Sequence, residues 1–333
     1  MRKVVWLVLT GLLVASAAVA QSYPSQPVTF VVGFGAGGGT DLTGRGLAQA
    51  MGEYWGVTTT VINVTGGSGG IAAEQVITAA RNGYTILVSP EIMAAQAVMG
   101  FHPTTAFEHW QHFTAAGFNG VISVRPDSPF QTIEQLFDHV RANPNTVTLG
   151  ASSAGTIWHI QSELTRDVAD INFRFVPYQG SAPAQVAAVS GEIDVVWTSI
   201  GEQRDLLRSG QLRPLAVFTS EPVDIPGVGV VPAVTSAVPE LEDFLPFSSF
   251  IGLAVPRDMP EEIQAAIEEA YLAAVASEAF RDLIEGQLTG SVLGFDRVES
   301  DEFVRRNTSV IAWLLYDLDL ADNSPEQFGI PRP

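Results

Sequence analysis

The residues best suited to covalent chemistry lie in a glycine-rich turn. The segment Gly66–Gly70 reads GGSGG and matches the G-x-S-x-G pattern, which exposes a serine nucleophile between a strand and a helix. A hydrolase of this type also needs an acid and then a histidine further along the chain. All five histidines lie in the first half of the sequence. A secreted α/β hydrolase that uses Ser68 is therefore only an alternative, and we expect that the protein is not an enzyme.

Two other patterns suggest cofactors but lack the residues that cofactor sites require. His109 and His112, with His102 nearby, form a histidine cluster, but a metal site needs a further donor at suitable spacing, and the sequence has no cysteine. The segment Gly33–Gly38 matches G-x-G-x-x-G, yet a dinucleotide-binding fold also requires an acidic residue at the end of the next strand. That strand has none. We therefore expect neither a metal nor another cofactor.

The segment Gly33–Asp41 (GFGAGGGTD) is better suited to binding an anion without reacting with it. An expected strand precedes it and an expected helix follows it, and ligands of open α/β sheets bind just beyond the carboxyl ends of strands. A helix start presents unpaired N–H groups and a partial positive charge. Glycines let the backbone approach a ligand closely, and Thr40 or Asp41 can cap the helix. The segment therefore predicts a carboxylate or phosphate site.

A second loop of the same kind lies in the middle of the chain. Gly150–Trp158 (GASSAGTIW) also joins a strand to a helix, and Ser152, Ser153 and Thr156 place hydroxyl groups beside the helix start. The indole of Trp158 is suited to stacking on a ligand or to packing between lobes. Two such loops, one in each lobe, can hold one anion from both sides. Two further strand ends on the same side carry candidate contacts, Tyr178 and Thr198.

Alternating strands and helices must position these loops. Strands are expected at 28–32, 58–64 and 85–89, with helices at 41–54 and 71–80 between them, which is typical of right-handed crossovers and a largely parallel sheet. A second alternating set begins near Val121, and the chain then returns to complete the first set. We expect two lobes with a cleft that closes by a hinge. The expected boundaries are residues 21–121 plus 251–333 for lobe 1 and 122–250 for lobe 2.

The N-terminus and the charge indicate where the protein works. Arg2 and Lys3 precede a short apolar run, and Ala18-Val19-Ala20 gives a cleavage pattern, so residues 1–20 are expected to be a signal peptide that is cleaved after Ala20. The released protein is then periplasmic. The chain has 17 basic and 36 acidic residues, a net charge of −19, which disfavours nucleic acid and anionic lipid as partners. Any anion site must therefore be built from local dipoles.

Several segments together resemble one family, the periplasmic receptors of tripartite tricarboxylate transporters, also called Bug receptors. The resemblance covers nearly the whole mature chain and rests on motifs that occur in the family's order. These are Tyr23–Val28 (YPSQPV), Gly37–Asp41 (GGGTD), Gly66–Gly70 (GGSGG), Asn82–Thr85 (NGYT), Val176–Ala184 (VPYQGSAPA), Gly191–Asp194 (GEID), Ser209–Ala216 (SGQLRPLA) and Gly252–Pro256 (GLAVP).

The resemblance implies an α/β Venus-flytrap fold, that of periplasmic binding proteins, with mixed, mostly parallel sheets flanked by helices. It also implies that a monomer captures a small di- or tricarboxylate, aromatic acids included, and delivers it to one large and one small permease subunit in the membrane. A receptor that serves a signalling partner stays an alternative. Trp158 departs from the family's usual loop and favours a longer or flat ligand. Matched to the family's loops, the ligand-binding residues are Phe34, Gly37, Gly38, Gly39, Thr40, Asp41, Ser152, Ser153, Thr156, Ile157 and Trp158.

Overall fold

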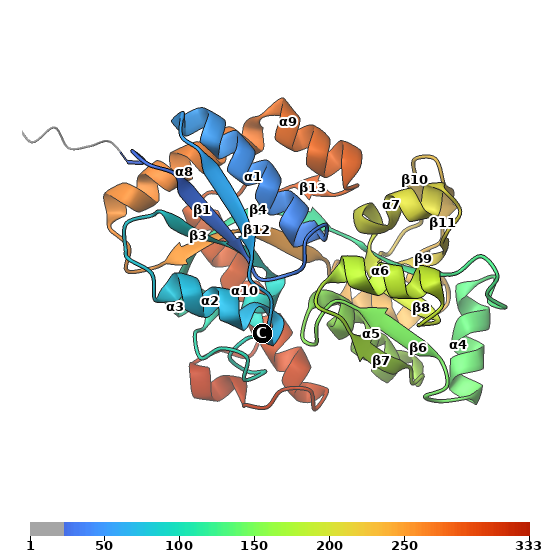
Figure 1. The fold of residues 1–333 in the computed structure, drawn as a ribbon. Helices are drawn as coiled ribbons and strands as arrows, with labels where there is room; N and C mark the ends of the chain where they lie inside the picture. Colours follow the sequence, from blue (N-terminus) through green and yellow to red (C-terminus); the bar gives the residue numbers. More distant parts are fainter. Residues whose placement is uncertain (1–22) are drawn as a thin grey trace, which may run out of the picture.

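The computed structural model describes residues 23–333, so the expected signal peptide and its cleavage site lie outside the described residues. The chain forms two α/β units side by side (Figure 1). The first contains a six-stranded sheet in the order β13-β4-β12-β3-β1-β2. Its strands are β1 (Val28–Val32), β2 (Thr59–Asn63), β3 (Thr85–Pro90), β4 (Trp110–Phe118), β12 (Ser249–Pro256) and β13 (Ser291–Val292). Its helices are α1 (Gly39–Trp55), α2 (Gly70–Ile77), α3 (Ala106–His109), α8 (Glu261–Ala276), α9 (Glu278–Arg281) and α10 (Arg297–Asp317).

The second unit contains a five-stranded sheet in the order β7-β6-β8-β5-β9. Its strands are β5 (Gly120–Val124), β6 (Thr148–Ala151), β7 (Arg174–Pro177), β8 (Val195–Ser199) and β9 (Arg213–Val217). Its helices are α4 (Ile133–Ala142), α5 (Ile157–Ala169), α6 (Ser181–Ser190) and α7 (Ile200–Arg208). The segment expected to be a surface connection, 221–246, contains a small hairpin of β10 (Val223–Ile225) and β11 (Gly229–Val231).

The expected α/β architecture of mixed sheets flanked by helices is confirmed. Pairing is parallel among β1, β2 and β3 and among β6, β7 and β8. The other pairs are antiparallel, a larger share than expected. The reason is the path of the chain: β4 carries it towards the second unit and β12 brings it back, so these neighbouring strands run in opposite directions. Among residues 23–333, no helix is long and apolar enough to cross a membrane.

The chain passes between the two units at two places. β4 ends at Phe118 and β5 begins at Gly120, and the return occurs just before Ser249, where β12 begins. Both places lie close to the expected junctions. We propose these crossings as the lobe boundaries, and we call the unit built on β1–β4 lobe 1 and the unit built on β5–β9 lobe 2.

Buried strands and close glycine contacts place the loops that follow the strands. β1 reads VTFVV, and all its residues except Thr29 are buried, as expected for a strand covered on both faces. Directly after β1, a Cβ on Gly33 would lie 2.8 Å from the Cα of Gly69. The two glycine-rich loops of lobe 1 therefore lie against each other at the carboxyl ends of β1 and β2, and a side chain on Gly33 would push them apart.

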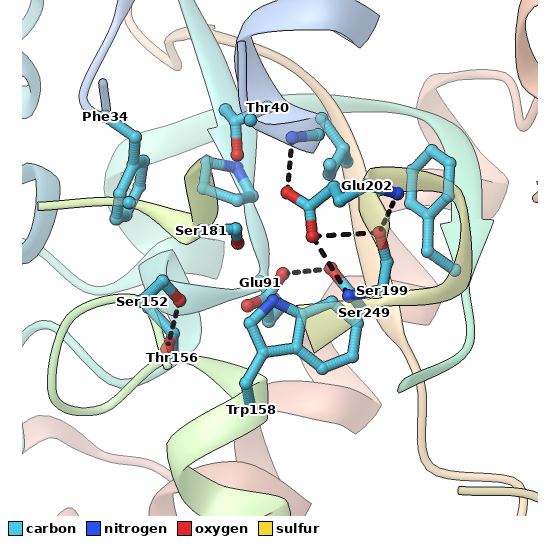
Figure 2. Close-up of a pocket in the computed structure, with 16 residues that line it drawn as sticks. Phe34, Thr40, Glu91, Ser152, Thr156, Trp158, Ser181, Ser199, Glu202 and Ser249 are labelled. Atoms are coloured by element: carbon cyan, nitrogen blue, oxygen red, sulfur yellow. Dashed lines mark hydrogen bonds between the residues drawn. The ribbon is translucent and has the colours of Figure 1, made fainter. Parts of the chain in front are cut away.

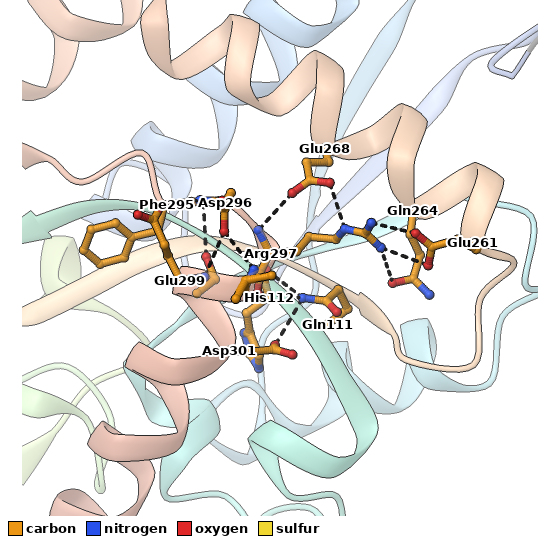
Figure 3. A network of polar contacts seen from close by, with 12 residues as sticks. Gln111, His112, Glu261, Gln264, Glu268, Phe295, Asp296, Arg297, Glu299 and Asp301 are labelled. Carbon is orange, nitrogen blue, oxygen red and sulfur yellow. Dashed lines mark hydrogen bonds and ion pairs between the residues drawn. The ribbon is translucent and has the colours of Figure 1, made fainter.

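An ion-pair network joins helices of lobe 1 to each other and to the end of a strand (Figure 3). The guanidinium of Arg297, at the start of α10, donates to both carboxylate oxygens of Glu261, and its Nε lies 2.8 Å from Glu268 Oε2; both acids are on α8. The hydrogen bond from Arg297 lowers the pKa of the Glu261 carboxyl. Farther along α10, Asp301 accepts two hydrogen bonds from Arg257. These contacts join α10 to α8 and to the end of β12.

Candidate functional site

A small cavity lies between the lobes, where the loops after the strands of both sheets meet (Figure 2). Its volume is about 30 Å³. Small-molecule sites usually measure roughly 300–1,000 Å³, so the lobes here are nearly closed on each other. The lining residues are Phe34, Gly38, Gly39, Thr40, Pro90, Glu91, Phe118, Ser152, Thr156, Trp158, Gly180, Ser181, Ser199, Glu202, Ser249 and Ile251.

Three helices that have no capping side chain of their own, α1, α5 and α6, begin at this cavity, beside the capped start of α7 at Ser199. The residues at their N-cap positions are Gly38, Thr156 and Gly180, and none of them donates or accepts a side-chain cap hydrogen bond. The first N–H groups of a helix have no partner within the helix. The N–H groups and the partial positive charge at the starts of one helix of lobe 1 and two helices of lobe 2 therefore converge on the cavity.

A carboxylate of lobe 2 occupies the start of α1. Glu202 Oε1 accepts a hydrogen bond of 2.5 Å from the backbone N–H of Gly39. Glu202 Oε2 accepts from the backbone N–H and the hydroxyl of Ser199, at 3.0 and 2.8 Å, which completes the capping box at the start of α7. Glu202 is thus fixed within its own lobe by one oxygen and reaches across the cleft with the other.

A carboxylate of lobe 1 occupies the start of α5 in the same way. Glu91, 4% exposed, follows directly after β3. Its Oε1 accepts from the backbone N–H of Ile157 at 3.0 Å, and its Oε2 accepts from the hydroxyl of Ser249, on β12, at 2.6 Å. Burial, with a smaller contribution from the nearby charge of Glu202, raises the pKa of the Glu91 carboxyl above its usual range, although the hydrogen bonds from Ser249 and Ile157 act in the opposite direction.

Two further hydrogen bonds join the lobes directly. The backbone N–H of Gly35 donates to the carbonyl of Gln179 at 3.0 Å. The hydroxyl of Ser68 donates to the carbonyl of Ala154, also at 3.0 Å. The serine of the G-x-S-x-G segment therefore bridges the lobes and donates to a backbone carbonyl, whereas the nucleophile of a hydrolase donates to a histidine.

Seven of the sequence-predicted residues line the cavity. From lobe 1, the β1–α1 loop contributes the ring of Phe34 and the backbone around Gly38 and Gly39, with Thr40 beside them. Lobe 2 contributes three side chains in contact with the cavity, Ser152, Thr156 and Trp158. The Ser152 and Thr156 hydroxyls are 2.8 Å apart. Trp158 is only 6% exposed, so its indole fills one wall of the cleft.

Asp41 lies outside this lining and braces the loop from behind. Its carboxylate accepts hydrogen bonds from the N–H of Gly37, from Arg45 and from Asn63, each at 2.9 Å. Asn63 also donates to the carbonyl of Phe34. Burial raises the pKa of the Asp41 carboxyl, but these hydrogen bonds together outweigh burial and leave it below its usual value. Gly37 and Asp41 thus shape the loop and make no contact with the cavity.

The remaining predicted residues also support the site without lining it. The hydroxyl of Ser153 donates to the carbonyl of Tyr178, which ties two loops of lobe 2 together. The Tyr178 hydroxyl points to Glu192. The Thr198 hydroxyl accepts from two buried glutamines inside lobe 2. Ile157 contributes through its backbone N–H, the donor to Glu91.

Sequence reasoning missed the two carboxylates and three serines of the lining: Glu91, Glu202, Ser181, Ser199 and Ser249. Two signals were present. Ser199 and Glu202 have the S-x-x-E spacing of a capping box at a strand end, and Glu91 directly follows a buried strand. Nothing in the sequence indicated that each carboxylate crosses to the other lobe, because that contact depends on how the two lobes face each other.

The histidine cluster has structural roles in lobe 1. His102 contacts Thr104 and Glu74, and His109 accepts from the N–H of Thr105. His112 contacts the carbonyl of Ala106 at 2.9 Å. Within residues 23–333, no group of three or more acidic or histidine side chains could hold a metal ion.

Comparison with known proteins agrees with this geometry. A protein of Pseudomonas sp. strain P51, from the tcbD–tcbE intergenic region, is 30% identical over 288 residues, which cover 83% of this chain and 84% of that protein. The structure of the periplasmic binding protein BugD has a TM-score of 0.79 at 24% identity. A protein of R. palustris with adipate has the same TM-score and identity. Each of these two alignments covers 90% of this chain and 99% of the other.

The structural neighbours confirm the periplasmic-binding-protein fold expected from the sequence. The matching family is described as the tripartite tricarboxylate transporter family receptor, and it matches residues 43–301. Its members and the structural neighbours are solute-binding receptors and not enzymes, which favours a receptor over the hydrolase alternative. The chain belongs to the receptor family of the tripartite tricarboxylate transporters.

Proposed function

We propose that this chain captures a small organic acid between its two lobes and presents it to a tripartite tricarboxylate transporter. The observation that carries the proposal is the meeting of three helix N-termini, from both lobes, at one cavity lined with hydroxyl groups. Backbone N–H groups at a helix start bind carboxylates well. The adipate complex of the R. palustris protein, which has the same fold, supports an organic acid as the class of ligand.

Binding requires the lobes to move. A cavity of about 30 Å³ has no room for an organic acid, so the lobes must separate for the ligand to enter. The two strand crossings near Asn119 and before Ser249 are the places where the backbone can bend. Closing brings the α1 start of lobe 1 and the α5 and α6 starts of lobe 2 onto the same ligand.

The cellular setting follows from the same proposal. Residues 1–20 act as a signal peptide that is cleaved after Ala20, and the mature monomer works in the periplasm. There it meets one large and one small permease subunit in the membrane. Co-purification of the receptor with those two subunits, when all three are produced together, tests this partnership against a signalling role. Capture of a membrane sensor protein in their place would contradict it.

Thermal unfolding against a panel of organic acids tests the ligand class. The protein is first unfolded and refolded to remove carried-over ligand. A ligand at 100 times its Kd stabilises the folded state by about 2.7 kcal/mol, and at roughly 2–4 °C per kcal/mol the melting temperature rises by several degrees. We expect one or a few carboxylates to produce this shift. If neutral sugars shift the melting temperature and no organic acid does, the proposed ligand class is wrong.

A further inference from the structure

Each cleft glutamate is held in place by its own lobe. Ser249 fixes one oxygen of Glu91 within lobe 1, and Ser199 fixes one oxygen of Glu202 within lobe 2. These contacts do not depend on the other lobe, so they persist when the cleft opens. In each carboxylate the other oxygen faces the opposite lobe (Figure 2). A ligand that enters the cleft therefore meets two pre-positioned carboxylate oxygens.

Among residues 23–333, the lining of the cavity contains two glutamates and no lysine, arginine or histidine that could balance them. The two carboxylates are close enough for the charge of Glu202 to act on Glu91. Like charges repel strongly where water is largely excluded. A ligand with a carboxylate at both ends would add negative charge beside them, whereas an N–H donor or an ammonium group would pair with them.

The start of α6 remains available for one ligand carboxylate. Ser181, its first residue, is 5% exposed and lines the cavity, and its hydroxyl has no hydrogen-bond partner among residues 23–333. Figure 2 shows this side chain among the lining residues, between Thr40 and Glu91 in the view. The Thr40 hydroxyl faces the same space from lobe 1. The cavity thus has a donor side at Ser181 and Thr40 and an acceptor side at Glu91 and Glu202.

We infer that Glu91 and Glu202 determine specificity: the cleft prefers an organic acid with one carboxylate and an ammonium, amide or other N–H donor at the opposite end over the matching dicarboxylate. This inference rests on the proposed function and narrows its ligand class. The carboxylate lies at the α6 start, and the donor end lies between the two glutamates.

Isosteric pairs of compounds test the inference. Succinate, glutarate, adipate and phthalate are each compared with their monoamides, succinamate, glutaramate, adipamate and phthalamate, by calorimetric titration of the refolded protein. 4-Aminobutyrate and glutamate extend the set to ammonium groups. In the pair that binds most tightly, we expect the monoamide to bind at least about tenfold more tightly than the dicarboxylate, a difference in binding free energy of about 1.4 kcal/mol.

Charge-neutral variants assign the preference to the two glutamates. Glu91→Gln and Glu202→Gln keep the size of the side chain, and each is expected to reduce the preference by about tenfold, mainly because the dicarboxylate binds better. Glu240→Gln removes the same charge from an exposed position of lobe 2 away from the cleft and is expected to leave the preference unchanged. Circular dichroism and melting temperature check the fold of each variant.

The outcomes separate the two proposals. If a dicarboxylate binds the wild type as tightly as its monoamide or more tightly, the inference is wrong while the receptor function stands. The inference also fails if the glutamine variants bind both members of a pair more tightly by the same factor, because the glutamates then only compete with the ligand for the helix starts. If no compound binds at all, the proposed ligand class fails together with the inference.

Discussion

Gly201 controls how far the lobes can close. It is the second residue of α7 in lobe 2, and a Cβ at this position would lie 1.8 Å from the carbonyl oxygen of Leu288 in lobe 1. Real Cβ atoms essentially never approach closer than 3.0 Å, and the atoms they would meet here are backbone. Gly201→Ala therefore acts as a wedge that separates the lobes by more than an ångström at this point, without changing the cavity lining.

The cost of that wedge follows from the contacts on either side of it. Glu202 accepts a hydrogen bond from Gly39, and Arg204 donates to the carbonyl of Gly286 at 3.2 Å; both contacts cross the cleft. A shift of more than an ångström breaks both. One bond has a charged acceptor and the other a charged donor on a partly buried side chain, so together they contribute about 2–3 kcal/mol to the closed form. We expect ligand affinity to fall about 30- to 150-fold.

Calorimetric titration with the best ligand of the panel measures this loss. Small-angle scattering at saturating ligand is expected to show a larger radius of gyration than in the wild type. The variant should fold, because alanine is a better helix former than glycine by up to about 1 kcal/mol. Arg208→Ala, at an exposed position at the end of the same helix, is the control, because the contact of Arg208 with the Pro226 carbonyl lies within lobe 2. Wild-type affinity in Gly201→Ala would refute the closure geometry described here.

Three further predictions concern the support of the site and the stability of lobe 1. Asp41→Ala removes the acceptor for three hydrogen bonds in the β1–α1 loop and is expected to lower the free energy of unfolding in urea by about 2–3 kcal/mol and to weaken ligand binding; unchanged stability would show that the loop does not need this brace. Burial lowers the pKa of His112 to about 4, so on acidification the unfolded chain binds a proton at His112 before the folded chain does. The free energy of unfolding therefore falls by up to about 1.4 kcal/mol per pH unit between pH 6.5 and 4. His112→Gln should remove this part of the pH dependence, and an identical pH dependence in that variant would contradict its assignment to His112. Arg297→Gln is expected to cost about 1–3 kcal/mol of stability with no change in ligand affinity, since neither Arg297 nor the glutamates that it contacts line the cavity; a loss of affinity without a loss of stability would contradict a purely structural role.

Much of the fold followed from local patterns in the sequence. Short apolar runs bounded by glycine and proline predicted β1, β3 and β8, because buried strands need continuous apolar residues. β4 was not predicted. Its sequence, WQHFTAAGF, carries polar residues whose partners come from α10 and β3, as in the hydrogen bond from Gln111 to Asp301 and the contact of His112 with Ser89. Such residues look like a loop until the distant parts of the chain that satisfy them are known.

The parts of the site formed by strand-to-helix loops were predictable from the sequence. The parts formed by contacts between the two lobes were less so. The glycine and hydroxyl loops at Phe34–Thr40 and Ser152–Trp158 were found, because strand-to-helix turns carry a recognisable composition. Asp41 was expected to contact a ligand, and the structure places it behind the loop, since Arg45 and Asn63 hold its carboxylate there. Glu91 and Glu202 were missed, because a carboxylate at a strand end has the same sequence pattern as an ordinary helix cap. Its contact with a helix of the other lobe depends on the tertiary arrangement.

The central claim is that one small organic acid binds between the lobes at the α6 start. Calorimetric titration of the best panel ligand into the wild type and into a Ser152→Ala/Ser181→Ala variant tests it most directly, because both hydroxyls line the cavity and the substitutions add no bulk. The account predicts one site per chain in the wild type and an affinity at least about tenfold weaker in the variant, at an unchanged melting temperature without ligand. Equal affinity in the two proteins would place the ligand elsewhere and contradict the account.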